Sequence, residues 1–514
     1  MVLNLIVETA HGRVRGTTQD GVAVFKCVPY GASTAGANRF RPPQKPAAWS
    51  DIRDVSAFTG RAPQAGLRSA NRPELEDFSG APDPSPETED CLTVNVWTPS
   101  TEPNAKAPVM VWFHGGAFSY GNANAPRLHG TRLAKRENVV IVTVNQRLNI
   151  FGHLDLPGIE GSGNAGTLDM VAALEWVRDN IAGFGGNPGN VTIFGESGGG
   201  GKVSTLLAMP SAIGLFHRAI IQSGAAVRLR TRERAAALTQ AVLGELGLTA
   251  DRIDALQALP VERLLAAVNP AQKAIGASPT PFFDRYPFGP VVDGAIIPAQ
   301  PFDPAAPDIS ANIPLIIGDM KDETANFLAV DDAVWNRTLT EDGLRSRLAP
   351  LAGAHTDRVL ATYQAMYPDA NPAERLIAAT TDCNFRLRSV VLAQRRAAKA
   401  AAPVWMYAFE WETPVLGGKL KAPHAMDVPF TFDTLELTNA TDLSHAARGL
   451  ALTMSSVWAA FAREGNPAHP SIPSWPAYRT PDRETLILDA QCRIERDPRG
   501  QSRRLWQEIT ETTL

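Results

Sequence analysis

The sequence predicts an α/β fold built on a large, mostly parallel central sheet with helices on both faces. Short apolar segments rich in β-branched and aromatic residues recur along the chain, each bounded by Gly, Pro, Asn or Asp, as is typical of buried strands. Helical periodicity follows several of them, as in Leu168 to Ile181, whose apolar side chains form one stripe. Strands that alternate with helices indicate a parallel sheet covered on both faces. The expected strands are Cys91 to Trp97, Val109 to Phe113, Val139 to Val144, Val191 to Phe194, Ala219 to Gln222, Ile313 to Ile317, Val404 to Trp411 and Thr485 to Leu488, after a hairpin between Leu5 and Tyr30.

A single domain of residues 1–514 is expected, although the length alone would suggest about three domains. No Gly/Ser-rich or highly charged linker divides the sequence. Two mainly helical insertions, at about 225–310 and 325–400, are rich in Ala, Leu and Arg. We expect these insertions to pack over one end of the sheet and to form the walls of a pocket there.

Composition excludes several classes of partner. The 49 Lys and Arg against 53 Asp and Glu leave a net charge of −4 without a long block of either sign, so nucleic acid is not expected. No apolar run approaches the ~20 residues that span a bilayer, and the first residues lack the pattern of an export signal. The cysteines form no CxxC pair, and no His stands at zinc-ligand spacing. We expect a cytoplasmic monomer or small homo-oligomer without a membrane partner or a bound metal.

A Gly-flanked serine follows the expected strand Val191 to Phe194. Ser197 stands in Gly-Glu-Ser-Gly-Gly, ahead of a helical run, which is the Gly-x-Ser-x-Gly pattern in its meaningful context. In such a turn the serine backbone is strained, so Gly195 and Gly199 must lack side chains. The helix N-terminus adds partial positive charge where an oxyanion would develop. The segment predicts a nucleophilic serine on the α/β-hydrolase fold.

The same glycines invite a second interpretation, because a Gly-rich turn before a lysine also describes a phosphate-binding P-loop. The register does not fit. Glu196 occupies the place of the first required glycine before Gly201 and Lys202, and Val203 stands where a Ser or Thr should bind magnesium. We therefore reject the P-loop.

An oxyanion loop is predicted upstream. The strand Val109 to Phe113 runs into His-Gly-Gly-Ala-Phe, and consecutive glycines after a strand let backbone N–H groups turn into a cavity. We assign the donors to Gly116, Ala117 and Gly198. The loss of one such donor typically costs about 10²–10³ in rate.

The base and the acid should follow the nucleophile, because this fold places Ser, acid and His in that order on loops after strands. Among nine histidines, His424 follows the expected strand Val404 to Trp411 on a loop, which suits a general base. The expected strand Ile313 to Ile317 runs into a charged loop that offers three candidate acids. The order of the residues in the chain does not choose among Asp319, Asp322 and Glu323.

The sequence resembles the type-B carboxylesterase family nearly from end to end. The resemblance is carried by collinear motifs: Glu89-Asp-Cys-Leu-Thr-Val-Asn-Val-Trp, His114-Gly-Gly-Ala-Phe, Asn145-Gln-Arg-Leu-Asn-Ile-Phe-Gly, the run from Asn164-Ala-Gly to Phe194-Gly-Glu-Ser-Gly-Gly, Gln222-Ser-Gly, Pro290-Val-Val-Asp-Gly and Phe461-Ala-Arg-Glu-Gly-Asn-Pro. It implies Glu323 as the acid, because the family's strand-Gly-x-x-x-x-Glu pattern falls on it, and supports His424 as the base. It also implies that Ser223 supports the triad by hydrogen bonding, and we count Glu196 as a second supporting residue.

Departures from the family pattern narrow the kind of esterase that the sequence predicts. Gly198 stands where the family usually has Ala, which should keep the N–H donor but loosen the turn. Ala62 replaces the Cys that pairs with the counterpart of Cys91 in extracellular members, which fits a reduced, intracellular protein. Between Arg61 and Asp90 there is no Trp or Tyr, so the cation-binding aromatic of cholinesterases is missing.

The predicted function is hydrolysis of carboxylic esters through an acyl-enzyme, without a cofactor. The expected pocket is apolar, with Phe118 beside the oxyanion loop and Phe283 or Phe288 near the acyl group, which favours hydrophobic esters. Related enzymes with this style of oxyanion loop accept esters of tertiary alcohols, which we carry as a hypothesis for bulky substrates. Two alternatives stay open: the same residues could attack carbamates or amides, or the chain could be a non-catalytic binding module.

Overall fold

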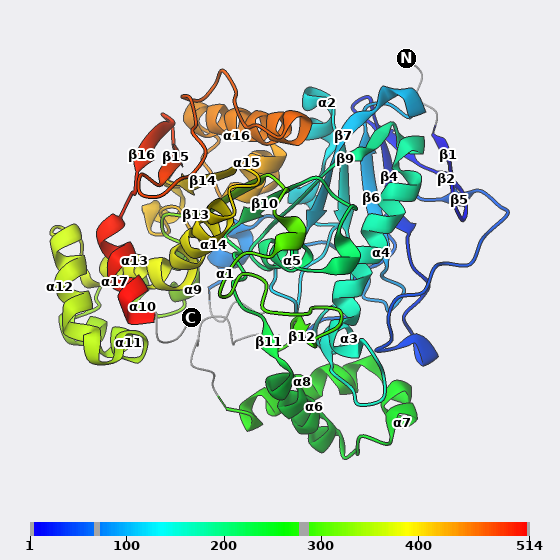
Figure 1. Ribbon diagram of the computed structural model, residues 1–514, viewed down its shortest axis with the longest axis horizontal. Helices are drawn as coiled ribbons and strands as arrows, with labels where there is room; N and C mark the ends of the chain where they lie inside the picture. The colour runs from blue at the N-terminus through cyan, green and yellow to red at the C-terminus, as the bar shows by residue number, and fades with distance from the viewer. Residues whose placement is uncertain (1–4, 66–71, 277–286, 511–514) are drawn as a thin grey trace.

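An eleven-stranded sheet runs through the computed structural model, which describes residues 5–65, 72–276 and 287–510 (Figure 1). Its strand order is β16-β15-β14-β13-β10-β9-β7-β8-β6-β4-β3. The strands from β15 to β8 in this order are parallel, and antiparallel strands complete both edges. The strands are β3 (Thr17–Gln19), β4 (Val22–Pro29), β6 (Thr93–Thr98), β7 (Ala107–Phe113), β8 (Val140–Val144), β9 (Gly186–Glu196), β10 (Arg218–Gln222), β13 (Leu315–Met320), β14 (Val404–Phe409), β15 (Glu484–Leu488) and β16 (Arg493–Arg496).

The expected N-terminal hairpin divides between two sheets. β3 and β4 pair across Gly21 in the large sheet, as predicted. The residues before them form β1 (Ile6–Thr9) and β2 (Gly12–Arg15), which pair with each other and with β5 (Arg53–Asp54) in a small separate sheet. A third sheet joins β11 (Arg230–Thr231) to β12 (Val291–Val292).

Alternate side chains of the central strands enter two different cores. Val111 and Ile193 lie in a core shared with α4 (Ala165–Asn180), α5 (Gly198–Leu206), α14 (Leu387–Ala398) and α17 (Gly500–Thr510). Their neighbours Trp112 and Phe194 lie in a core shared with α2 (Thr131–Glu137), α15 (Asp427–Phe432) and α16 (His445–Glu464). Because successive side chains of a strand point to opposite faces, the sheet is covered by helices on both. The predicted α/β class is confirmed.

Further helices gather at two places in Figure 1. At the lower edge, α6 (Arg232–Leu246), α7 (Ile253–Ala258) and α8 (Val261–Ala274) share a third core with α3 (Asn149–His153). Between β13 and β14 the chain forms the shorter helices toward the left of the view, which are α9 (Ala325–Leu328), α10 (Asp332–Trp335), α11 (Glu341–Ala352), α12 (Thr356–Met366) and α13 (Pro372–Thr381). A π-helical turn, Asp382–Arg386, joins α13 to α14, and α1 (Pro73–Phe78) precedes β6.

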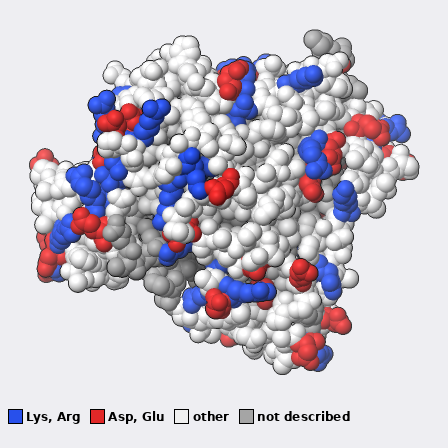
Figure 2. Space-filling model, viewed as in Figure 1, with Lys and Arg blue, Asp and Glu red and all other residues white. Residues whose placement is uncertain are grey.

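The face in Figure 2 carries interspersed positive and negative side chains around a broad uncharged area. No helix of the described residues is both long and apolar enough to cross a bilayer.

Candidate active site

Ser197 occupies the turn between the end of β9 and the start of α5. Its backbone has φ 57° and ψ −121°, a left-handed conformation that L-residues rarely adopt. The turn is held from both sides, because the Ser197 N–H donates to Gln222 O at 2.8 Å and its carbonyl accepts from the Gly201 N–H at 3.0 Å. The strain predicted for a nucleophile turn is therefore present at this serine.

The glycines around Ser197 are required by close backbone contacts. A Cβ on Gly199 would lie 2.0 Å from Phe113 O, and a Cβ on Gly195 would lie 2.6 Å from the carbonyl carbon of Gly199. Both atoms belong to the backbone and cannot swing aside. Only glycine fits at these two positions, as the Gly-x-Ser-x-Gly pattern demands.

The oxyanion loop contacts this turn directly. Gly116 and Ala117 both have positive φ, at 90° and 53°, in a tight turn after β7. A Cβ on Gly198 would lie 2.2 Å from Ala117 O and 2.4 Å from Ala117 N. The backbone of the oxyanion loop therefore fills the space that the methyl group of the family's usual Ala would need. The N–H groups of Gly116, Ala117 and Gly198 donate no hydrogen bond within the described residues.

Glu323 is the carboxylate that reaches the histidine. His424 Nδ1–H donates to Glu323 Oε2 at 2.5 Å, and Glu323 Oε1 accepts from the Met320 N–H at 2.9 Å. The backbone N–H of His424 also donates to Glu323 O, at 3.3 Å. These contacts fix the imidazole so that Nε2 is its free nitrogen. Both side chains are buried.

The other two candidate acids have different partners. Asp319 lies inside β13, which is longer at its end than the expected strand, and its carboxylate is 3.6 Å from Arg386 and 3.8 Å from Arg499. Asp322 accepts from the Ala422 N–H at 3.4 Å. Neither carboxylate is within ion-pair distance of His424, whose carboxylate partners among the described residues are Glu323 and Glu196.

The free nitrogen of His424 faces Glu196. His424 Nε2 lies 3.2 Å from Glu196 Oε1, and the Ser197 hydroxyl makes no hydrogen bond to His424 within the described part of the chain. Because catalytic hydrogen bonds are often long or misaligned before substrate binds, this geometry leaves a role for His424 as base open. The contact places Glu196, which the sequence analysis counted as a supporting residue, beside His424.

Burial and charge shift the pKa values of this pair. Burial raises the pKa of Glu196 to about 8, although the nearby His424 opposes the shift. For His424 burial alone would lower the pKa, but Glu196 and Glu323 outweigh it and raise the pKa to about 9. Two buried carboxylates thus favour the imidazolium form of His424.

Two aromatic rings flank His424, and sequence reasoning missed both. The ring centroids of Phe327 and Phe385 each lie 5.0 Å from that of His424. Phe327 follows Glu323 by one helical turn in α9, a spacing that could have drawn attention to it. Phe385 lies in the π-helical turn, which no pattern in the sequence predicts.

The residues expected to line the substrate pocket lie in different parts of the structure. Phe118 packs edge-on against His153, with ring centroids 5.3 Å apart, beside the oxyanion loop. Phe288 is buried in the third core, with α6 and α8. Phe283 lies outside the described residues. The Ser223 hydroxyl is buried with no hydrogen-bond partner among described residues, so the support expected from it is not seen in this structure.

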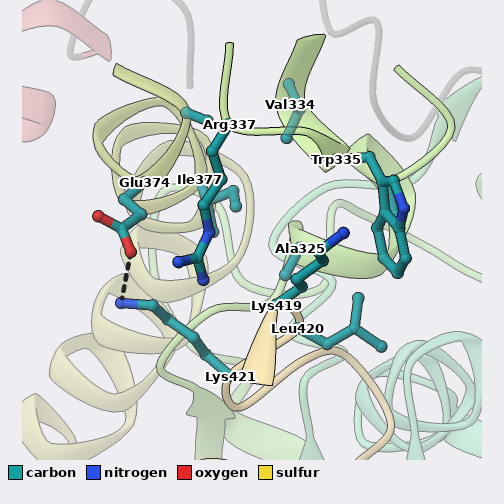
Figure 3. Close-up of a pocket in the computed structure, with 11 residues that line it drawn as sticks. Ala325, Val334, Trp335, Arg337, Glu374, Ile377, Lys419, Leu420 and Lys421 are labelled. Atoms are coloured by element: carbon teal, nitrogen blue, oxygen red, sulfur yellow. Dashed lines mark ion pairs between the residues drawn. The ribbon is translucent and has the colours of Figure 1, made fainter. Parts of the chain in front are cut away.

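A small pocket lies among α9, α10, α13 and the segment around Leu420 (Figure 3). Its lining includes Ala325, which follows Glu323 closely in the chain, and Lys421, which precedes His424. Both lysines of the lining have partners, because Lys421 Nζ is 3.3 Å from Glu374 Oε1 and Lys419 Nζ lies 4.5 Å from the Trp335 ring centroid. None of the predicted catalytic residues lines it, and we do not assign it to the reaction.

Known proteins resemble the chain over nearly its whole length. Residues 4–506 match the carboxylesterase family. The chain is 39% identical to the para-nitrobenzyl esterase of Bacillus subtilis (strain 168) over 505 residues, 97% of each chain. A carboxylesterase structure from Geobacillus stearothermophilus matches with a TM-score of 0.84 and 34% identity, covering 98% of this chain and 100% of that one. An esterase from Clostridium hathewayi that can hydrolyse aliphatic aromatic polyesters matches with a TM-score of 0.80 and 33% identity, covering 99% and 98%.

Proposed function

The chain belongs to the carboxylesterase family and has the α/β-hydrolase fold, and from this premise we propose that Ser197, His424 and Glu323 hydrolyse carboxylic esters through an acyl-enzyme. The family resemblance predicted from the motifs is confirmed, as is the class of enzyme, a carboxylesterase. The observation that carries the residue assignment is the 2.5 Å contact between His424 Nδ1 and Glu323 Oε2. It lies next to the only Gly-x-Ser-x-Gly turn in the sequence.

The proposed reaction has two symmetric halves. His424 Nε2 takes the proton of the Ser197 hydroxyl as its Oγ attacks the ester carbonyl, and Glu323 stabilises the imidazolium that forms. His424 then gives this proton to the departing alcohol, which leaves an acyl group on Ser197. A water molecule, activated by the same nitrogen, attacks the acyl group and releases the acid. Every proton transfer uses His424, so the scheme requires no cofactor.

The oxyanion loop would stabilise the negative charge that develops on the carbonyl oxygen. The N–H groups of Gly116, Ala117 and Gly198 are uncommitted in the described chain and come from two segments in direct contact. Donors held in place before the reaction stabilise an oxyanion without reorganisation. We propose these three groups as the oxyanion hole.

Glu196 competes with the nucleophile for His424 in this scheme. Its Oε1 lies 3.2 Å from the nitrogen that must reach Ser197 Oγ. Binding of an ester therefore has to shift His424 or Glu196 so that Nε2 turns to the serine. Burial disfavours the charged form of Glu196 and raises its pKa, which weakens the hold of this carboxylate on the imidazole.

The proposed substrates are hydrophobic and bulky esters. Phe327 and Phe385 lie beside His424, and Phe118 belongs to the oxyanion loop, so these apolar rings favour uncharged acyl or alcohol groups. One relative is named a para-nitrobenzyl esterase and another is an esterase that can hydrolyse aliphatic aromatic polyesters, and esters of both kinds are aromatic and bulky. We propose that esters of tertiary alcohols, which are bulky, are also substrates.

The test compares wild type with Ser197→Ala on p-nitrophenyl esters of increasing chain length, a para-nitrobenzyl ester and tert-butyl acetate. We expect turnover by the wild type alone, and mass spectrometry after an organophosphate should place the phosphoryl group on Ser197. Activity that survives in the variant, or modification elsewhere, would refute the assignment. A matched p-nitroanilide and a p-nitrophenyl carbamate measure the competing amide and carbamate activities, and binding without any turnover would favour the non-catalytic alternative.

A further inference from the structure

Lys202 is a buried cation that the proposed reaction does not use. It lies in α5, five residues after Ser197, and is only 1% exposed. In the sequence it drew attention as the lysine of a P-loop whose register does not fit. Its side chain instead turns toward the oxyanion loop, where Nζ donates to His114 O at 2.8 Å.

Two further groups from the same neighbourhood surround the ammonium group. With its amide nitrogen donating to Val144 O, the Gln146 oxygen accepts from Lys202 Nζ at 3.1 Å. The ring centroid of Phe118 lies 5.7 Å from Nζ, within the ~6 Å range of cation–π contacts. Lys202 therefore touches both ends of the His114 to Phe118 loop.

No carboxylate balances this charge. Among the described residues none lies within ion-pair distance of Nζ. Burial lowers the pKa of Lys202 to about 7, and no neighbouring anion opposes it. A buried ammonium without a counter-ion is unfavourable, and an apolar side chain of similar length would fill the space without this penalty. Packing alone does not account for a lysine here.

The loop itself needs an anchor. Gly116 and Ala117 have left-handed backbones, and an alanine is strained in that conformation. The helix α5 holds the loop at two points: the Gly198 backbone packs against Ala117, and Lys202 binds the His114 carbonyl at the start of the loop. One helix thus sets both the nucleophile turn and the oxyanion loop relative to each other.

We propose that Lys202 is a positioning residue of the oxyanion hole, whose terminal N–H group fixes the His114 carbonyl and thereby the N–H groups of Gly116 and Ala117. This inference rests on the proposed function, because it concerns the same oxyanion.

The test uses Lys202→Met, which keeps the length of the side chain without a donor, and Lys202→Gln, which keeps a neutral donor. Thr205→Val is the matched control, since Thr205 is buried on the same helix and its hydroxyl bonds only to Gly201 O within it. For each variant we would measure kcat and KM on p-nitrophenyl butyrate. We would also measure the affinity for a trifluoromethyl ketone, which adds to the serine as an oxyanion, and the unfolding midpoint.

Lys202→Met should lower kcat by about 10- to 100-fold, less than the loss of an oxyanion donor itself, because the donors stay present but lose their anchor; KM should be nearly unchanged. The affinity for the trifluoromethyl ketone should fall by a similar factor, and Lys202→Gln should recover part of both losses. Thr205→Val should behave like wild type.

The role of Lys202 alone would be overturned if a folded Lys202→Met or Lys202→Gln protein kept the kcat and the ketone affinity of the wild type. This conclusion requires that the wild type is active and that its activity depends on Ser197. A lowered unfolding midpoint with unchanged kcat would show a structural role only. A wild type without Ser197-dependent turnover would instead overturn the proposed function, and this inference with it.

Discussion

Glu196 Oε1 lies 3.2 Å from His424 Nε2, the one imidazole nitrogen that Glu323 leaves free. The residue next to the proposed nucleophile, Ser197, in the chain is therefore also the neighbour of the proposed base, His424, in space. This contact connects the charge of the turn to the protonation of His424, because a nearby carboxylate favours the imidazolium form. It makes the pH dependence of the enzyme a direct probe of the site.

Glu196→Gln should shift the rising limb of the pH profile of kcat/KM to lower pH. His424 must be neutral to accept a proton, and burial would lower its pKa, whereas Glu196 and Glu323 raise it to about 9. Removal of one carboxylate charge should lower that pKa by about 1 to 3 units. The measurement is kcat/KM against pH for both proteins. A limb that stays in place or moves to higher pH would contradict this role of Glu196.

Glu323→Gln should lower kcat by about 10⁴-fold while KM changes little. A Gln side chain offers an N–H group to the imidazole and favours the wrong tautomer, as the equivalent change does in other triads. Asp322→Asn is the matched control, because Asp322 is in the same loop but accepts from the Ala422 N–H rather than from His424. Equal losses in the two variants would argue against Glu323 as the acid.

The choice among the candidate acids could not be made from residue order in the sequence. Residue order left three acids open, and only the family pattern selected Glu323. The structure adds the reason that order could not supply: Asp319 is inside β13 and faces Arg386 and Arg499, whereas Glu323 is on the turn beyond the strand. A shift of a few residues at a strand end decides the partner of each carboxylate, and strand ends are what patterns locate least well.

The central strands and the Ser197 turn could be predicted because their patterns are local. Strand β9, the glycines and α5 follow one another in the sequence, and each carries its own signal. The Glu196 to His424 contact, the Phe385 ring and the environment of Lys202 depend on segments far apart in the chain. No periodicity encodes such contacts, and the π-helical turn that carries Phe385 has no simple sequence signature.

Gly198→Ala should reduce kcat by about 10-fold, although Ala is the usual residue of the family here. The added Cβ would lie 2.2 Å from Ala117 O, so the oxyanion loop would have to move away from the nucleophile. Steady-state kinetics on a small and a bulky ester measure the effect, and we expect KM for the small ester to change little. A variant as fast as wild type would mean that the loop shifts without cost.

Phe385→Ala should weaken the preference for long acyl chains. Its ring lies beside His424, so its loss removes apolar surface next to the reacting carbonyl. The ratio of kcat/KM for p-nitrophenyl octanoate to that for the acetate should fall by about 10-fold. Trp335→Ala, in the pocket of Figure 3, should leave this ratio unchanged. A ratio that responds to Trp335 and not to Phe385 would move the acyl site to that pocket.

The central claim is that Ser197 carries the acyl group, and trapping that intermediate tests it most directly. The enzyme would be mixed with p-nitrophenyl butyrate, quenched in acid during turnover, digested and analysed by mass spectrometry. We predict a butyryl group on the peptide that contains Ser197, and none in the Ser197→Ala protein. Butyrylation of another residue, with turnover persisting in Ser197→Ala, would contradict the account.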